Sequence, residues 1–184
     1  IDLVKKLIGA LDQNRSKAHV LFSSSIQENI DNLYGKSKKA GRELLASWAE
    51  KNGSLFTGLI FPNIFGPFGN PYHNSFIATF SHQFTHGENP EIEIDKMVPL
   101  LYVTEAVQTI TDAILEKKNL REHRISHSTG IKVTDILELL KSFKSTYFEH
   151  GIIPVFNNTF EINLFNTFRC YMDLRNHYPA KYIQ

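Results

Sequence analysis

The sequence predicts an α/β protein built on a parallel β-sheet with helices on both faces, and three observations lead to this prediction. Helical and strand-like apolar patterns alternate along the first part of the 184-residue chain. The two early strand-like runs are apolar at nearly every position, as in parallel strands that are buried on both faces. Polar or turn-forming residues follow each run, which allows the chain to change direction there.

The first four segments give this alternation. In chain order they are a helix over 1–11, a strand over 18–22, a helix over 34–51 and a strand over 55–61. Leu3 and Leu7 are spaced for one face of the first helix. Three serines end the first strand, and Asn52-Gly53 is a typical end for the second helix.

The later segments mix helices with shorter strands. We expect a loop over 62–71, a helix over 74–86, a short strand over 91–94, a helix capped by Thr104 and running to about 117, a short strand over 124–126, a helix over 133–143, an irregular stretch over 151–158 and a helical one over 160–171. We expect residues 1–172 to form one domain whose substrate-binding part starts at about residue 63. The polar residues 173–184 then form a linker or tail.

Composition excludes several functional classes. The 20 Lys and Arg residues nearly balance the 19 Asp and Glu residues, whereas nucleic-acid-binding proteins usually show a basic face. No apolar run approaches the roughly 18 residues that a membrane span needs. Cys170 is the only cysteine, which fits a reducing, cytoplasmic setting. The histidines show no metal-ligand spacing. We therefore expect a cytoplasmic protein without nucleic acid, membrane or metal partners, and the opening in mid-helix without Met suggests that the sequence begins inside a fold.

The main chemical motif is Tyr34-Gly35-Lys36-Ser37-Lys38, at the start of the second helix. Residues four apart lie on one helical face, so Tyr34 and Lys38 point toward the same region. An ammonium group beside a phenol favours the phenolate, which can then exchange a proton with a sugar hydroxyl or carbonyl. Alone, such a pair is more often a surface Tyr and Lys on an amphipathic helix.

The flanking segments make the catalytic interpretation more specific. The motif follows Phe22-Ser23-Ser24-Ser25 and precedes Phe61-Pro62-Asn63-Ile64-Phe65-Gly66-Pro67. In this order the segments resemble the extended short-chain dehydrogenase/reductase family of nucleotide-sugar epimerases, dehydratases and reductases. The resemblance implies the carboxy-terminal part of a Rossmann-like doubly wound parallel sheet, with a small, mostly helical substrate-binding region.

The resemblance also implies roles for individual residues. The catalytic residues are Ser25, with Ser24 as second choice, and the pair Tyr34 and Lys38. The cofactor, NADP or NAD, would contact Ser23, Tyr34, Lys38, Pro62 and Asn63. The substrate, a UDP-sugar, would contact Ser24, Ser25, Asn63, His73, Asn74, Ser75 and Lys96. The start of a helix near Asn74 is also a reasonable anion site on physical grounds.

A narrower resemblance is to a subgroup of capsule-synthesis enzymes. It rests on the short gap between the serines and Tyr34, on Asn74-Ser75-Phe76-Ile77-Ala78-Thr79-Phe80 and on Ile136-Leu137-Glu138-Leu139-Leu140. These enzymes join a reductase domain to a cupin epimerase domain in the UDP-N-acetyl-L-fucosamine pathway. The resemblance implies reduction of a 4-keto UDP-6-deoxy-amino sugar in capsule or O-antigen synthesis.

The sequence departs from this family in several places. The glycine-rich loop that binds the cofactor pyrophosphate is absent from the sequence, as is the cupin domain. Ile60 and Lys96 stand where many relatives have arginine, and lysine cannot offer a bidentate fork.

Two alternatives to an enzyme remain open at this stage. The chain could be a non-catalytic fragment that acts as a scaffold or oligomerisation module through the apolar face of residues 40–49. It could also be a generic ligand-binding α/β domain, which would leave the Ser–Tyr–Lys set unexplained. We also expect a homo-oligomer, because an incomplete sheet exposes an edge and apolar helix faces.

Overall fold

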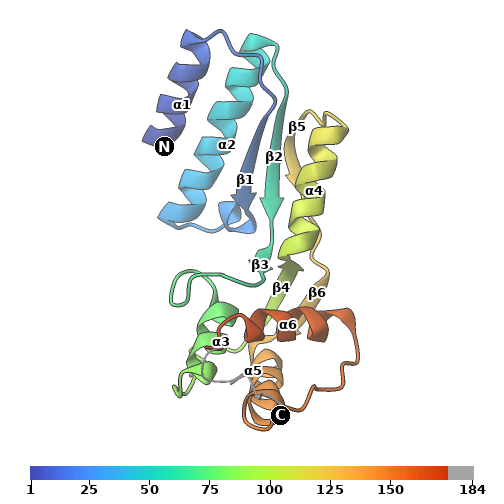
Figure 1. Ribbon diagram of the computed structural model, residues 1–184. Coiled ribbons are helices and arrows are strands. Elements are labelled where there is room, and N and C mark those ends of the chain that lie inside the picture. The colour runs from blue at the N-terminus through green and yellow to red at the C-terminus, as the bar shows by residue number, and fades with distance from the viewer. Residues whose placement is uncertain (174–184) are drawn as a thin grey trace. The chain divides into compact units, whose positions relative to one another are not determined.

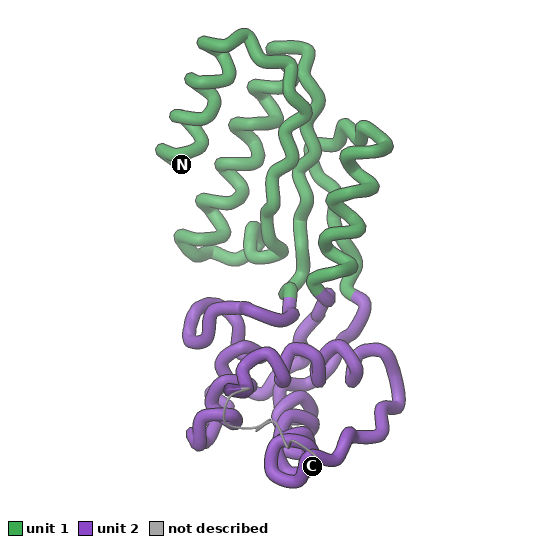
Figure 2. The backbone as a smooth tube through the Cα atoms, in the orientation of Figure 1, with its two compact units in different colours: residues 1–64, 103–127 green, residues 65–102, 128–184 purple. Residues whose placement is uncertain are grey.

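The computed structural model describes residues 1–173 and divides the chain into two compact units (Figure 2). Unit 1 contains residues 1–64 and 103–127, and unit 2 contains residues 65–102 together with the chain from residue 128 onward. The predicted linker or tail over 173–184 lies outside the described residues except at its first position. Unit 2 starts at Phe65; that the substrate-binding part begins at about residue 63 stays a prediction.

Unit 1 is built on a parallel sheet of three strands (Figure 1). They are β1 (Val20–Ser25), β2 (Phe56–Phe61) and β5 (Leu120–Arg124), in the order β1-β2-β5. The register of the first pair runs from Val20 opposite Phe56 to Ser25 opposite Phe61. The parallel sheet predicted from the apolar runs is confirmed, and β1 extends through all three serines rather than stopping before them.

Three helices and one short 3-10 helix complete unit 1. They are α1 (Asp2–Gln13), η1 (Ile26–Asn29), α2 (Leu33–Asn52) and α4 (Val103–Leu115). Gly53 ends α2 in the left-handed conformation, at φ 61°, which glycine adopts without steric cost. This confirms the predicted helix end.

The apolar face of α2 is buried inside unit 1. Leu45, Ala46, Trp48 and Ala49 form a cluster with Phe56 of β2, and apolar side chains of α1 pack against it. The indole Nε1 of Trp48 also donates to Asp12 of α1 at 2.8 Å. Leu45, Trp48 and Ala49 of the face that we expected to meet a partner are therefore buried within unit 1, whereas Ala40 and Leu44 are half-buried.

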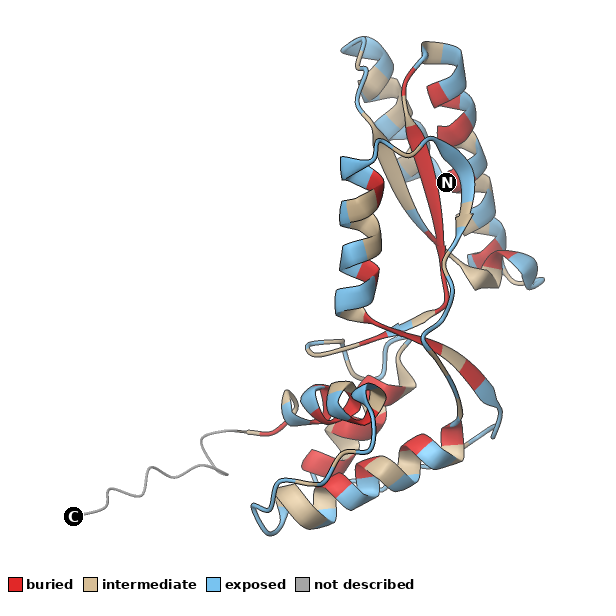
Figure 3. Cartoon of the chain, turned by 90° about the vertical axis from the view of Figure 1, so that its right-hand side faces the viewer, coloured by how far each residue is buried: buried red, intermediate tan, exposed pale blue. Residues whose placement is uncertain are grey.

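The two early strands differ in burial, although both were expected to be covered on both faces. All six residues of β2 are buried (Figure 3). In β1 only Ser24 is buried, and Ser23 is exposed. The cause is their place in the sheet. Within the described residues β2 lies between two strands, and β1 pairs with β2 alone.

Unit 2 combines a small second sheet with helices. The sheet contains β3 (Asn63–Phe65), β4 (Met97–Tyr102) and β6 (Thr129–Lys132) in the order β3-β4-β6, and β4 runs antiparallel to β6. The first two residues of β3 still belong to unit 1. The helices are α3 (Phe76–Thr85), α5 (Val133–Phe143), the π-helical turn η2 (Lys144–Phe148) and α6 (Thr159–Arg169). The mostly helical region predicted after residue 63 is confirmed, with this sheet in addition.

The helices of unit 2 enclose an aromatic core. The rings of Phe143 and Phe165 lie 5.2 Å apart and nearly perpendicular, a geometry that aromatic pairs prefer. Phe168 is fully buried beside them. These three residues join α5 to α6, while α3 packs against both helices.

Several boundaries differ from those that the sequence predicts. Residues 91–94 form no strand, and Thr104 lies inside α4 rather than capping it. Of the strand expected over 124–126, only Arg124 belongs to a strand, as the last residue of β5. The loop over 62–71 contains β3, and β4 and β6 were not expected. The helix over 133–143 agrees at both ends.

Candidate active site

Tyr34 and Lys38 lie in the first two turns of α2. Asn32 caps this helix, and its Oδ1 accepts a hydrogen bond from the backbone N–H of Gly35 at 2.6 Å. Such a cap fixes where a helix begins. The Lys38 ammonium lies 5.7 Å from the centre of the Tyr34 ring, and Tyr34 is 46 % exposed. The pair therefore meets at an accessible surface, as the four-residue spacing predicts.

Lys38 also joins the helix to the serine-rich end of β1. Its Nζ donates to the backbone carbonyl of Ser23 at 3.0 Å and lies 5.4 Å from the centre of the Phe22 ring. The flexible lysine stem is thus held in place by the strand. This contact places the ammonium beside the Tyr34 ring.

The three serines have different surroundings. The buried hydroxyl of Ser24 donates to the carboxylate of Glu28. The hydroxyl of Ser25 accepts from the N–H of Gln27 at 3.2 Å and caps η1. A hydroxyl that accepts still has its own proton to donate. Ser25 can offer that proton to a ligand, whereas the proton of Ser24 is already used inside the protein.

Pro62 and Asn63 lie at the same edge of the sheet as the serines. They follow β2 directly, and Ser25 is paired with Phe61, the last residue of β2. The carboxyl ends of parallel strands share one edge, where ligands of open α/β sheets bind. Within unit 1 the structure therefore gathers the predicted catalytic and cofactor residues at one edge.

A buried ion pair, which sequence reasoning missed, lies behind the serines. Arg42 of α2 and Glu28 of η1 are each only 2 % exposed and lie 2.8 Å apart. Burial alone would raise the pKa of Glu28, but hydrogen bonds from Arg42 and Ser24 outweigh it and hold that pKa below its usual value. Hydrogen bonds to Glu28 raise the pKa of Arg42, against the effect of burial. Both groups are therefore charged at neutral pH.

Gly35 allows close contact between α2 and the segment that follows the serines. A Cβ atom at this position would overlap the carbonyl oxygen of Gln27 and would approach that of Ile30 to 3.0 Å. Only glycine leaves room for this approach. The glycine next to the candidate catalytic tyrosine thus has a packing role that the motif alone did not reveal.

In unit 2, the predicted substrate residues His73, Asn74 and Ser75 lie at the start of α3. Ser75 caps the helix by accepting from the N–H of Ala78 at 3.3 Å. Asn74 has a φ of 60°, in the left-handed region, and both it and His73 are exposed. The sequence suggested a helix that starts at residue 74. In the structure all three residues precede α3, which begins at Phe76.

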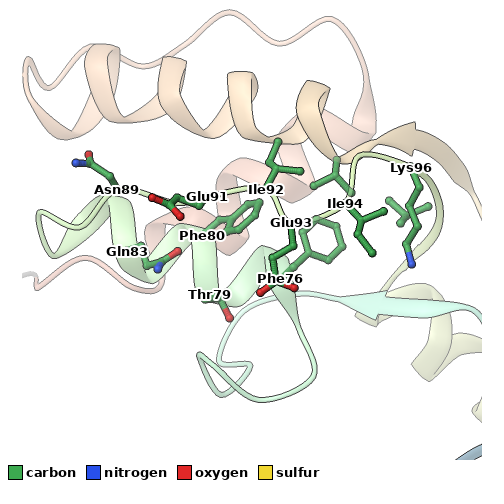
Figure 4. Close-up of a pocket in the computed structure, with 12 residues that line it drawn as sticks. Phe76, Thr79, Phe80, Gln83, Asn89, Glu91, Ile92, Glu93, Ile94 and Lys96 are labelled. Atoms are coloured by element: carbon green, nitrogen blue, oxygen red, sulfur yellow. The ribbon is translucent and has the colours of Figure 1, made fainter. Parts of the chain in front are cut away.

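A pocket of about 610 Å³ lies between α3 and the segment that leads to β4 (Figure 4). Of the predicted substrate residues only Lys96 lines it; His73, Asn74 and Ser75 do not. Two carboxylates, from Glu91 and Glu93, also line it. The other lining residues are apolar or neutral, namely Phe76, Thr79, Phe80, Gln83, Asn89, Ile92, Ile94, Val98 and Val133.

Sequence reasoning missed most of this pocket. The alternating pattern of residues 91–94 predicted a strand, but the segment 89–96 has no regular structure. The spacing of Phe76 and Phe80 on a predicted helix is equally compatible with core packing. Phe80 is indeed buried and still lines the pocket.

Neither a metal site nor a membrane span is found in residues 1–173. No group of three or more His, Cys, Asp and Glu side chains there could hold a metal ion. No helix in this range is both long and apolar enough to cross a bilayer.

Comparison with known proteins identifies relatives of this arrangement. Residues 7–126 match the model of the NAD dependent epimerase/dehydratase family. A UDP-2-acetamido-2,6-beta-L-arabino-hexul-4-ose reductase of Pseudomonas aeruginosa is 29 % identical over 147 residues, which cover 79 % of this chain and 40 % of the relative.

Solved structures support the same assignment. The capsular polysaccharide assembling protein CapF of Staphylococcus aureus has 31 % identity and a TM-score of 0.80, over 96 % of this chain and 50 % of that protein. A UDP-N-acetylglucosamine 4-epimerase of Methanobrevibacter ruminantium shares the fold, with 20 % identity and a TM-score of 0.75 over 93 % of this chain and 68 % of that one. The chain thus spans half or less of the length of the first two relatives.

Proposed function

Because the chain belongs to the NAD dependent epimerase/dehydratase family, we propose that it carries the proton-transfer residues of a nucleotide-sugar reductase/epimerase. The proposed reaction of the whole polypeptide is reduction of a 4-keto UDP-6-deoxy-amino sugar. The reductase named for the Pseudomonas relative and the similarity to CapF favour this substrate class and a place in capsule or O-antigen synthesis.

The observation that carries the proposal is the joint placement of Tyr34, Lys38 and Ser25 in unit 1. Lys38 lies beside the Tyr34 ring and is held by the Ser23 carbonyl. Ser25 ends the strand that this lysine contacts, and its hydroxyl proton is available. A surface Tyr and Lys on an ordinary amphipathic helix would not need this anchoring.

Each of these residues has a distinct part in moving one proton. Tyr34 exchanges a proton with the sugar oxygen at C4, as a general acid in reduction. Lys38 stabilises the negative charge that the Tyr34 oxygen then carries. Ser25 donates a hydrogen bond to the same sugar oxygen and orients it toward Tyr34.

The residues at this edge fit one end of a nicotinamide cofactor. When bound, that cofactor supplies the hydride of the reaction. Lys38 and Tyr34 offer donors to its ribose hydroxyls, and the backbone at Pro62 and Asn63 lies along the same sheet edge. No strand-to-helix turn within residues 1–173 has the glycines of a pyrophosphate loop, so that half of the cofactor requires groups outside this range. We propose NADP, with NAD as the alternative.

Unit 2 supplies the proposed site for the nucleotide part of the substrate. The pocket beside α3 has aromatic side chains for a base and carboxylates that can accept hydrogen bonds from hydroxyl groups. Lys96 is its cation and can pair with a phosphate. We propose that His73, Asn74 and Ser75 contribute from the start of α3.

The alternative of a non-catalytic scaffold has less support from the 40–49 face, because Leu45, Trp48 and Ala49 are buried in the core of unit 1. A homo-oligomer in the cytoplasm remains part of the proposal, and the single thiol and the half-covered strand β1 agree with it.

The test is turnover by the whole polypeptide with the keto sugar nucleotide named for the Pseudomonas relative, using NADPH and NADH in parallel. Tyr34→Phe should lower kcat by about 10²- to 10⁴-fold, the usual contribution of general acid catalysis. Lys38→Met should also be severely impaired. Its neighbour Lys39 is exposed and lies off the Tyr34 face, so Lys39→Met is the matched control and should remain active. Full activity of Tyr34→Phe would refute the proposed mechanism.

A further inference from the structure

Arg42 forms an unusually complete set of contacts for a side chain that reaches no solvent. Its Nε donates to both carboxylate oxygens of Glu28, at 2.9 and 3.1 Å, and its Nη2 donates to Glu28 at 2.8 Å. Nη2 also donates to Glu122 at 2.9 Å, and Nη1 donates to the carbonyl of Arg121 at 3.0 Å. One side chain of α2 therefore bonds to both η1 and β5.

A glycine in β2 makes room for this side chain. A Cβ atom at Gly58 would lie 2.4 Å from the carbonyl oxygen of Arg121, 2.7 Å from Cδ of Arg42 and 2.8 Å from its Cγ. The guanidinium can reach β5 only because its stem passes over β2 where there is no side chain. Strand β2 thus has a glycine at the position where the Arg42 side chain of α2 crosses it.

Stability alone is a poor explanation for this arrangement. Taking two charges out of water is costly, and apolar side chains of similar size are often as stable or more stable. Buried charges are best attested where they fix one arrangement of the chain among several. Arg42 and Glu28 lie where the end of β1 meets α2, so this is the arrangement that they can fix.

The contacts fix the serine-rich strand end against the helix that carries Tyr34. Glu28 receives the hydroxyl proton of Ser24 and belongs to η1, which begins directly after Ser25. Arg42 lies one turn beyond Lys38 and two turns beyond Tyr34 on the same side of α2. Lys38 holds the carbonyl of Ser23 from this side.

We propose that Arg42, acting through Glu28, is a positioning residue that sets Ser25 and Tyr34 in register for the proton transfer. This inference rests on the proposed function. Arg42 and Glu28 touch no substrate, because both are buried behind the strand end. Without them, Ser24 and η1 lose their common anchor, and the Ser25 hydroxyl is no longer held relative to the helix.

The decisive variant is Glu28→Met/Arg42→Met in the whole polypeptide. It removes both charges together, so that neither is left buried without its partner, and the fold should be retained. The matched control is Glu138→Met/Lys141→Met, which removes an exposed pair from α5. Thermal unfolding of both variants shows first that each is folded.

The first readout is amide hydrogen exchange measured by NMR, which does not depend on turnover. In the double variant at 28 and 42, the amides of Gln27 and Gly35 should exchange at least about tenfold faster while the thermal midpoint is maintained. The control variant should leave both rates unchanged. Unchanged exchange at these amides would overturn the inference, whatever the enzyme does.

The second readout is the split between kcat and KM for the sugar nucleotide. A positioning role predicts a kcat at least about tenfold lower with KM within about twofold, since small misplacements of reacting groups are costly. The conservative variant Glu28→Gln keeps an acceptor for Arg42 and should recover part of kcat. An unchanged kcat in the folded double variant overturns the inference. If the unmodified polypeptide shows no turnover, the proposed function fails, and hydrogen exchange alone decides the positioning role.

Discussion

Gly35 lies directly against the backbone of Gln27, so close that a methyl group on Gly35 would overlap the Gln27 carbonyl oxygen. The backbone of α2 is therefore in direct contact with the backbone of η1, the turn that follows the serines. The residue in this contact is the direct neighbour of Tyr34, which makes the position of the candidate catalytic phenol depend on a glycine.

Gly35→Ala should consequently destabilise unit 1 by more than about 2 kcal/mol, because overpacking at backbone atoms cannot be relieved by a rotamer change. Gly9→Ala is the matched control, since nothing lies within 4 Å of a Cβ at Gly9 in α1. It should stabilise the chain by about 0.5–1 kcal/mol through helix propensity. Urea unfolding of both variants measures the two effects, and equal values for them would contradict the contact described here.

Replacing Ser24 and Ser25 by alanine should have different effects, one on stability and the other on kcat. Ser25→Ala should lower kcat of the whole polypeptide by about 10²-fold, the usual effect of losing one donor to a reacting oxygen. Ser24→Ala should cost about 1–2 kcal/mol of stability, because Glu28 loses a buried hydrogen bond. Parallel kinetics and urea unfolding compare the two. The assignment of roles fails if Ser24→Ala has the larger effect on kcat and Ser25→Ala the larger effect on stability.

Glu28 should make the stability of unit 1 sensitive to acid. Its pKa in the folded state lies below the usual value, so the unfolded chain takes up this proton first as the pH falls. The stabilisation is present above the usual carboxyl pKa of about 4.3 and is lost as the pH falls through the lower, folded value. The stability difference between the parent and Glu28→Gln should therefore be largest near neutral pH and shrink below about pH 4. Glu138→Gln, which changes an exposed ion pair, is the control and should alter stability little, because exposed pairs contribute little.

His82 should give unit 2 a pH dependence in a higher range. Burial, with a smaller effect from His86, lowers the pKa of His82, and Glu88 opposes this shift. The unfolded chain then binds the proton first as the pH falls below about 6.5, so unit 2 loses stability between neutral and mildly acidic pH. His82→Phe keeps an aromatic ring beside Tyr72 and should flatten this slope. Urea unfolding midpoints from pH 5 to 8 measure this pH dependence. Parallel curves for the parent and His82→Phe would rule out a role of His82.

The sequence predicted the elements that have one clear physical cause. The helix over 133–143 was placed correctly because its apolar residues recur at helical spacing, and Ile136, Leu140 and Phe143 are buried as that spacing requires. The parallel pair β1 and β2 followed from two apolar runs of similar length. Tyr34 and Lys38 were found because a four-residue spacing on a helix needs no tertiary information.

The second sheet could not be predicted by the same rules. Pro99 lies in β4, between β3 and β6, although proline lacks the N–H that a central strand uses and so argues against a strand. Strand β6 has four residues and contains Gly130. The alternating pattern of residues 91–94 looked more like a strand than either, yet Ile92 and Ile94 line the pocket instead.

The anchoring of the candidate site was also beyond the sequence. Arg42 and Glu28 read as ordinary surface charges of a helix and a loop, and only the fold shows that both are buried. Ser24 and Ser25 are chemically identical in the sequence. Their difference arises because alternate residues of a strand point to opposite faces, and only the structure shows what each face meets.

The division of unit 1 into two stretches of chain has a consequence for the order of folding. Strands β1 and β2 with α2 between them form a contiguous segment, whereas the first residue of β5, Leu120, pairs with Thr57 across all of residues 65–102. Closing so long a loop lowers the chain entropy before strand pairing can offset that cost in free energy. The β1–α2–β2 segment should therefore acquire protection first in pulse-labelled hydrogen exchange and β5 last. Arg42 would then pair with Glu28 first and gain its two acceptors in β5, the Arg121 carbonyl and Glu122, only after the ribosome has released residues 120–124.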